Sequence, residues 1–332
     1  MKREESCSAR LGRVGGQAVL EGVMMKSGDR TALAVRDETG KIRTSVDTHT
    51  SVRKKYKFLN IPLLRGIVNF VETMILSYNT LMQSADMLGI DEAAEDSKFE
   101  AWLRSKWGDK FMAVLMGIAT VLGMVVGLGL FLYLPAFVTK WLDSLLGGIG
   151  WFRNVIEGVM KIAIFVAYIA LCSLMKEMRR TFEYHGAEHK SIACYESGME
   201  LTPANAAKCS RFHPRCGTSF LFVILILSIL VNSLISWENL ALRVVLKVLL
   251  LPVIVGLGFE FIMYAGKHTN ALTRLLSAPG LWMQRITTRE PDESQLEIAI
   301  TALKLAMPDE FPPEAAEEED NTNSADADVK TD

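Results

Sequence analysis

The sequence predicts an all-α polytopic membrane protein with about four transmembrane helices, an amphipathic or re-entrant helix, and a small N-terminal cytoplasmic module that contains a β-hairpin. Half of the 332 residues are hydrophobic. Four stretches approach the roughly 20 apolar residues that a helix needs to cross a bilayer. They are 111–137, 155–175, 220–235 and 244–266.

Positive charge predicts the orientation of these four stretches. Lysine and arginine are dense before the first stretch, between the second and third, and after the fourth. By the positive-inside rule, both termini and the segment 176–218 are expected on the cytoplasmic side of the cell membrane. A cleavable signal peptide is not expected, because more than a hundred mostly polar residues precede the first stretch.

The N-terminal module, residues 1–57, is expected to contain a β-hairpin. The runs TALAVR at 31–36 and KIRTSV at 41–46 are rich in strand-forming residues, and the turn-prone DETG at 37–40 connects them. Gly15 and Gly16 lack the spacing of either nucleotide-binding fingerprint, so no phosphate loop is predicted.

Residues 58–110 are predicted to hold an amphipathic helix over 61–83 and a soluble link at 91–110. Polar residues of this apolar helix fall on one stripe, namely Arg65, Asn69, Glu72, Asn79 and Gln83. The helix could lie on the membrane with its stripe facing water. Alternatively, it is buried or re-entrant and the stripe lines a polar cavity.

The membrane region is expected to cover 111–266, followed by a cytoplasmic helical segment at 267–306. That segment is predicted to turn at Pro279-Gly280 and to form a helix over 295–306, with acidic residues at its start. Residues 307–332 carry ten acids and one lysine. A composition this polar predicts a disordered acidic tail.

The cysteines predict thiols or metal ligands and not a disulfide framework. A cytoplasmic location places them in or beside a reducing compartment. The five residues are Cys7, Cys172, Cys194, Cys209 and Cys216.

The run HGAEH at 185–189 has the pattern H-x-x-E-H of an inverted zincin. On a helix over 181–196, His185 and His189 share one face, and Glu188 can hold a water beside a metal that they bind. The pattern predicts a divalent metal site, with zinc as the metal that suits imidazole. In this interpretation Glu188 is the general base.

A catalytic zinc site takes three protein ligands, so the two histidines need one partner. The candidates are Glu196 on the same helix, His213 and Cys216 from the following loop, and Glu260 from the fourth apolar stretch. Glu260 qualifies because an ionisable residue inside a span is a functional candidate, although a pairing with Lys267 or with water would also explain it.

The loop could also bind a structural metal by itself. Its spacing is C-x₃-H-x₂-C from Cys209 to Cys216, without the paired C-x₂-C knuckles of a strong zinc motif. The alternative is a simple turn, formed by Pro214 and Gly217, that leads into the third apolar stretch.

Five blocks of sequence together resemble the YqhQ-like bacterial membrane proteins, the domain of unknown function 1385. They are GGQAVLEGVMM at 15–25, IPLLRG at 61–66, EYHGAEHK at 183–190, HPRCGTSF at 213–220 and PGLWMQRITTREP at 279–291. The resemblance covers about residues 12–306 and implies a membrane protein labelled as a predicted metal-dependent enzyme. Within these blocks, Gln17, Glu21 and Arg65 could face a cytoplasmic site or hold the soluble module against the membrane helices.

The predicted function is a metal-dependent hydrolase at the cytoplasmic membrane face, with membrane lipids as partners and a lipid-linked molecule or membrane peptide as substrate. The rival is a non-catalytic scaffold or assembly factor with a structural His/Cys metal site. A transporter is weaker, because no inverted repeat is evident. Nucleic-acid binding is not expected, because topology explains the basic face.

Overall fold

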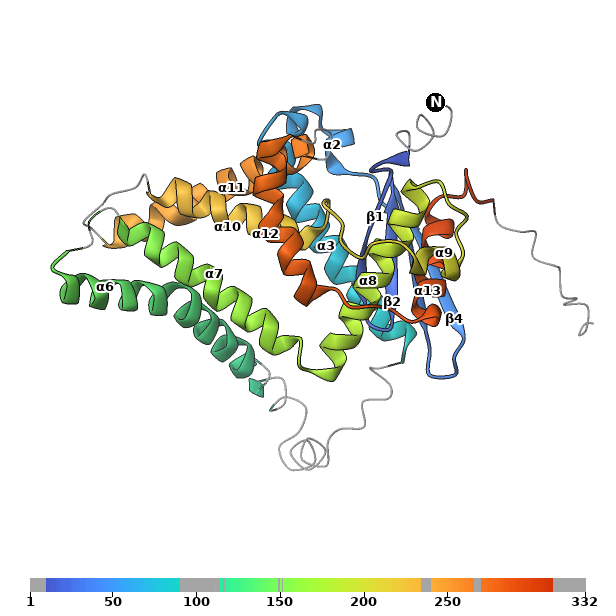
Figure 1. Cartoon of the computed structure of the whole chain (residues 1–332), viewed down its shortest axis with the longest axis horizontal. Coiled ribbons are helices and arrows are strands. Elements are labelled where there is room, and N and C mark those ends of the chain that lie inside the picture. Colours follow the sequence, from blue (N-terminus) through green and yellow to red (C-terminus); the bar gives the residue numbers. More distant parts are fainter. Residues whose placement is uncertain are drawn as a thin grey trace, which may run out of the picture.

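The computed structural model describes residues 10–89, 111, 114–115, 117–148, 150, 152–233, 240–265 and 270–312. A folded unit that contains a β-sheet lies at one end, and apolar helices lie at the other, with further helices between them (Figure 1). The predicted link at 91–110 falls outside the described residues, as does the acidic tail from residue 313.

The N-terminal module is a four-stranded antiparallel meander in the order β1-β2-β3-β4. The predicted hairpin is confirmed as β3 and β4, in which Arg36 pairs with Ile42. The sheet is larger than predicted, because two strands precede the hairpin. The bounds are β1 Val14–Val19, β2 Gly22–Ser27, β3 Arg30–Arg36 and β4 Ile42–Thr48.

Both faces of the sheet are covered, which explains why its central strands lack an alternating pattern. On β2, Val23 and Met25 join one apolar core while Met24 joins a second core on the opposite face. Successive side chains of a strand point to opposite faces, so a strand covered on both sides reads as a continuous apolar run.

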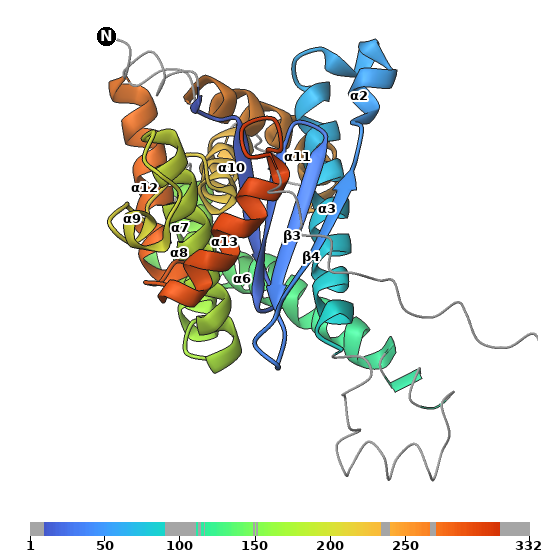
Figure 2. The same ribbon diagram turned by 90° about the vertical axis from the view of Figure 1, so that its right-hand side faces the viewer.

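Helices α8 and α13 cover the first face of the sheet, and α3 covers the second (Figure 2). Helix α13, Glu293–Ala306, matches the predicted C-terminal helix and begins with a capping box at Asp292 and Gln295. Helix α8, Lys176–Glu196, is followed by the short helix α9, Pro203–Ala207.

Two helices, Gly117–Leu146 and Phe152–Cys172, are long and apolar enough to cross a membrane, judged by length and composition. The first includes the π-helical turn η2, Gly129–Tyr133, and helix α6, Leu134–Leu146. This helix continues to Leu146, beyond residue 137, where the predicted span ends. The second is α7, which packs against α6 and α10.

Two further apolar helices complete this end of the molecule. Helix α10, Gly217–Ser233, and helix α11, Leu240–Ala265, pack against each other. Their apolar stretches, Phe220–Val231 and Leu249–Tyr264, are shorter than those of the other two helices.

Helix α3, Leu64–Met87, follows the short elements α2, Val52–Lys55, and η1, Lys57–Asn60. Most residues of its polar stripe are half-buried and hydrogen-bonded to other parts of the protein. Glu72 accepts hydrogen bonds from Ser51 Oγ at 2.8 Å and Val52 N at 2.7 Å. Arg65 pairs with Glu260, and Asn69 accepts a hydrogen bond from Arg53. Gln83 donates a hydrogen bond to Ser45, whereas Asn79 is exposed. The stripe therefore binds other parts of the protein.

Two predictions about the C-terminal segment were wrong. Pro279 and Gly280 form no turn, because both lie inside helix α12, Ala271–Thr287, which packs along α10. The first residues of the predicted tail are folded. Met307 is buried in the core, and Glu310 pairs with Arg13 and accepts from the Tyr195 hydroxyl at 2.9 Å.

Candidate metal centre

Helix α8 supplies the two histidines of the H-x-x-E-H motif, on one face as predicted. The centroids of the His185 and His189 rings are 4.5 Å apart. Helix α8 does not continue from α7, since the chain leaves helical geometry between Cys172 and Lys176. His189 is buried and His185 is partly buried, so the pair lies inside the folded unit and not on its surface.

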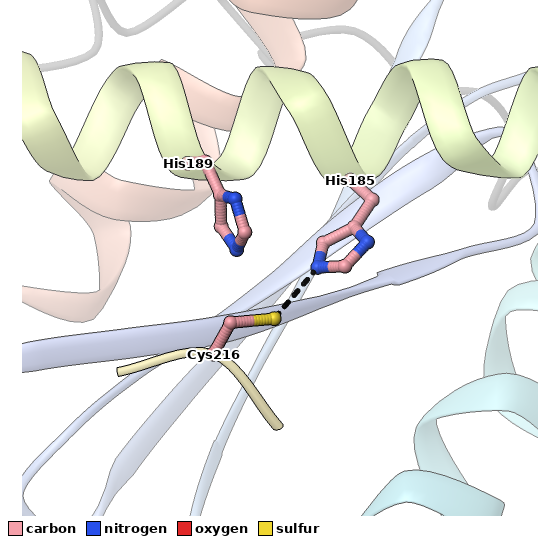
Figure 3. A group of neighbouring side chains, drawn as sticks. All are labelled: His185, His189 and Cys216. Atoms are coloured by element: carbon pink, nitrogen blue, oxygen red, sulfur yellow. Dashed lines mark hydrogen bonds between the residues drawn. The ribbon is translucent and has the colours of Figure 1, made fainter. Parts of the chain in front are cut away.

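Cys216 completes the group. It lies at the end of the 209–216 loop, directly before α10. The His185 Nε2 and Cys216 Sγ atoms are 3.2 Å apart, and the candidate ligand atoms of the three residues lie within 4.8 Å of one another (Figure 3). Of the four third-ligand candidates, the structure brings Cys216 to the histidines.

The outer ring nitrogens of both histidines are hydrogen-bonded to the backbone. His185 Nδ1 lies 2.8 Å from the Thr287 carbonyl oxygen, and His189 Nδ1 lies 2.6 Å from the Arg211 carbonyl oxygen. A carbonyl can only accept, so each Nδ1 carries the proton and each Nε2 keeps a lone pair. Metal-binding histidines are oriented in this way by partners outside the ligand set.

The three donor atoms therefore suit a metal of the zinc type. Two imidazole nitrogens and one thiolate form a known catalytic ligand set and leave a fourth position open. In the absence of a metal, a thiol proton between Cys216 and His185 satisfies the 3.2 Å contact. The three residues suit a metal because their candidate ligand atoms lie within 4.8 Å of one another.

Glu188 lies next to this group but is not a member of it. Its Oε2 atom is 3.9 Å from His185 Nε2. Burial raises the pKa of the Glu188 carboxyl, while the neighbouring His185 and His213 and the backbone N–H of Gly16 oppose that rise. Burial also lowers the pKa of His189, which favours the neutral ring that a ligand needs.

Strand β1 crosses directly over Glu188. A Cβ atom on Gly16 would lie 3.1 Å from Glu188 Cγ and 2.5 Å from the Met24 carbonyl oxygen. Only glycine allows the strand to approach this closely, so Gly16 has a structural role at the centre.

His213 and Glu196 form a separate charged group beside the centre. His213 Nε2 is 3.4 Å from Glu196 Oε2, and Glu196 also pairs with Arg215 and accepts from Gly12 N at 2.9 Å. The side-chain amide of Gln284 bonds both the N–H and the carbonyl of His213, at 2.8 and 2.7 Å. These contacts use the ligand atoms of Glu196 and hold the His213 ring 5.6 Å from that of His189.

Glu260 lies at another place altogether. Both of its carboxylate oxygens accept from the Arg65 guanidinium, with the Nε to Oε1 distance at 2.6 Å. A bidentate arginine satisfies a carboxylate by itself. The structure thus places Glu260 outside the histidine group and pairs it with Arg65, while the other expected partner, Lys267, lies outside the described residues.

The remaining candidates hold the soluble module in place. Gln17 donates to Thr80 Oγ1 of α3 at 2.6 Å, and Glu21 pairs with Arg180 and accepts from the Tyr184 hydroxyl at 3.3 Å. The backbone partners Thr287 and Arg211 were not predictable, because carbonyl groups carry no sequence signal.

Comparison with known proteins identifies the family. The family model "Protein of unknown function (DUF1385)" matches residues 61–309. The chain belongs to the DUF1385 family. A relative in this family, the "Uncharacterized protein YqhQ" of Bacillus subtilis (strain 168), is 33% identical over 291 residues, which cover 86% of this chain and 89% of the relative. No solved structure matches the chain.

The DUF1385 match contains every candidate ligand and the Glu188 carboxylate, whereas the four-stranded sheet precedes the matched residues. Gly16 contacts Glu188 from that sheet. The centre of this DUF1385 member is thus closed by a segment outside the matched region.

Proposed function

We propose that this protein is a metal-dependent hydrolase of the cytoplasmic membrane face, with His185, His189 and Cys216 as the ligands of a divalent ion such as zinc. The observation that carries the proposal is the convergence of three lone-pair donors, two of them oriented by backbone carbonyls. Zinc supplies Lewis-acid polarisation when bound.

Glu188 is the proposed general base. Its carboxylate lies 3.9 Å from His185 Nε2, close enough to accept a proton at Oε2 from a water beside the ligand atoms. Its burial keeps other water from the carboxylate, and the Gly16 N–H holds it from the opposite side. The sequence of proton transfer is water to Glu188, then Glu188 to the leaving group.

The membrane part of the proposal is four spans with both termini cytoplasmic. Two helices meet the length and apolarity of a span, and α10 and α11 supply two shorter apolar stretches. The centre would then lie at the membrane surface, because the 209–216 loop leads directly into α10. A lipid-linked molecule or a membrane peptide suits that location.

A structural metal centre is the second candidate function. The ligands and their backbone partners come from α8, the 209–216 loop and the end of α12, so a metal would join three segments. A structural zinc site has all four positions filled by protein. A fourth protein ligand that closes the open position would therefore support a scaffold in which nothing is hydrolysed.

Cobalt substitution distinguishes the two candidates. Purified protein loaded with Co²⁺ in place of the native ion is titrated with azide or a hydroxamate while its visible spectrum is recorded. An open position predicts a saturable spectral change in the wild type and in Glu188→Gln, and no cobalt spectrum in His189→Ala. A cobalt spectrum that neither reagent alters would overturn the hydrolase and support the structural centre.

A further inference from the structure

Helix α3 has the reverse of the usual arrangement of a surface helix. Most of its polar stripe faces the protein, where Ser45, Ser51 and Glu260 bind it. Many of its large apolar side chains are exposed, while Leu76 and Met87 pack against the sheet. An amphipathic helix of a soluble protein normally buries its apolar face and presents its polar face to water.

The outward face of α3 is a continuous apolar stripe, which we call the outer stripe: Val71, Met74, Ile75, Tyr78 and Met82. These side chains are 49%, 49%, 54%, 64% and 40% exposed. The last four residues follow Val71 by three, four, seven and eleven positions, which places all five along one side of the helix. A row of large apolar groups this exposed marks an interaction surface.

The N-terminal end of α3, just before the outer stripe, lies against the apolar helices. Helix α3 crosses α11 so closely that a Cβ on Gly66 would lie 3.0 Å from Gly256 Cα, and the Arg65–Glu260 pair lies beside this crossing. Small residues allow such close crossings between helices in membranes. Helix α11 also exposes large apolar side chains, such as Leu257 at 39% and Met263 at 41%.

The direction of α3 also suits a membrane surface. In Figure 1, α10 and α11 run across the picture while α3 runs steeply down it, between these helices and the sheet. The same upright course of α3 is visible behind the sheet in Figure 2. If α10 and α11 cross the bilayer, α3 lies along its surface.

A basic and aromatic segment precedes α3. Lys55 and Lys57 are exposed, as are Tyr56 at 45% and Phe58 at 67%. No acidic residue occurs between Asp47 and Glu72. Lysines next to exposed aromatic rings are typical of protein surfaces that contact anionic lipid headgroups.

We propose that α3 is an in-plane membrane helix, with its outer stripe among the lipid acyl chains and with Lys55 and Lys57 on anionic phospholipid headgroups. The occupant of this surface is the bilayer and not a second protein. The inference rests on the membrane part of the proposed function, since it assumes that the neighbouring helices cross the bilayer.

This placement connects the bilayer to the candidate metal centre through a single strand. Gln17 of β1 donates to Thr80 of α3, and the adjacent Gly16 donates to Glu188 on the opposite face of the sheet. The centre is therefore held at a fixed height above the headgroups. That position suits a substrate group carried by a lipid or by the end of a membrane peptide.

Photo-crosslinking in nanodiscs tests the placement of the outer stripe. The full chain carries benzoylphenylalanine at one position, is reconstituted in nanodiscs of phosphatidylcholine and phosphatidylglycerol, and is analysed for lipid adducts after irradiation. Positions 75 and 78 probe the outer stripe, position 251 on α11 is the membrane control, and position 208 near α9 is the soluble control. We expect adducts at 75, 78 and 251 and none at 208.

The outcomes separate the two hypotheses. Adducts at 251 without adducts at 75 and 78 would overturn the in-plane helix and leave the membrane spans intact. Absence at all four positions would overturn the spans themselves. A crosslink from 75 or 78 to a second protein, in place of lipid, would show that a protein covers the outer stripe and would also overturn the inference.

Native mass spectrometry tests the headgroup contact. The double variant Lys55→Gln/Lys57→Gln is compared with Lys208→Gln/Lys304→Gln, which removes the same charge from exposed positions of the folded unit. We expect preferential retention of phosphatidylglycerol to fall by about fivefold per lysine in the first variant, the size expected for one basic side chain at an anionic surface. Equal retention in both variants would overturn the headgroup contact.

Discussion

The histidine centre and the Arg65–Glu260 pair are both clusters of polar side chains, but they differ in how their hydrogen-bond donors and acceptors are arranged. Arg65 presents donors to both oxygens of Glu260, so the two residues satisfy each other. His185, His189 and Cys216 instead bring three acceptor atoms together, and their donors face outward to the backbone.

This difference separates a ligand site from a structural ion pair. Complementary groups complete each other and need no third component. Converging lone pairs repel one another unless a proton or a cation lies between them. The first arrangement explains Glu260 without a ligand, whereas the second can be completed either by the Cys216 thiol proton or by a metal ion.

Loss of a ligand should have the largest effect. We expect His189→Ala to lower zinc affinity by more than the roughly 10- to 100-fold associated with a lost partner outside the ligand set, because it removes a ligand itself. Metal content measured by plasma mass spectrometry, with affinity from competition with a chelator, checks this. Glu260→Gln is the matched control and should keep its metal. Equal and negligible metal in the wild type and all variants would remove the distinction between the two groups.

Gly186→Ala should have the next largest effect. Its Cβ would lie 1.9 Å from the Arg289 carbonyl oxygen, in the backbone that follows Thr287. Forcing that backbone away should cost about 1–3 kcal/mol, the usual range for an overpacked core. Thermal unfolding of the purified protein measures the loss, and zinc affinity should fall as well, because Thr287 positions His185.

Gly15→Ala is the control for this substitution, because a Cβ at Gly15 meets nothing within 4 Å. It should change stability by less than about 0.5 kcal/mol. Equal stability of the two variants would show that the 289–291 segment moves freely and that the centre does not depend on its position.

Breaking the Arg65–Glu260 ion pair should have a smaller effect. Arg65 and Glu260 side chains are 33% and 26% exposed, so Glu260→Gln should lower the free energy of unfolding by about 1 kcal/mol. Arg65→Met/Glu260→Met should recover part of the loss, because neither charge is then left alone. A loss of bound metal in Glu260→Gln would contradict the structural interpretation of this pair.

Asp37 is a second carboxylate whose oxygens are fully hydrogen-bonded within the protein, and its substitution should have the smallest effect. The Thr39 hydroxyl at 2.6 Å, Arg43 and the backbone N–H groups of Lys41 and Thr39 hold the pKa of Asp37 at about 2, below its ordinary value of 3.8, against an opposing effect of burial. A lowered pKa stabilises the fold above pH 3.8, and this contribution disappears as the pH falls through about 2.

Asp37→Asn should therefore be less stable than the wild type near neutral pH, and the difference should vanish toward pH 2. Unfolding midpoints measured across this pH range check the sign. Metal content should not change at any pH at which the wild type keeps its own, and a change would show that the hairpin turn influences the centre.

Local patterns in the sequence determined a substantial part of this protein. Strand-forming runs around DETG predicted the β3–β4 hairpin, and the acidic start at Asp292 predicted α13. The spacing of four residues placed His185 and His189 on one face, because helix geometry alone fixes that relation. Apolar composition predicted the long helices, though not where they end.

Tertiary structure decided the remainder, because it depends on which distant segments meet. Four residues were equally acceptable third ligands by chemistry. Only the fold brings Cys216 to the histidines and pairs Glu260 with Arg65 instead. Gly186 counts as a helix-weakening residue until the 289–291 backbone is seen packed against it. The stripe on α3 was visible in the sequence, but its partner was not. A sequence records which faces a helix has, and the packing of the whole chain decides what each face meets.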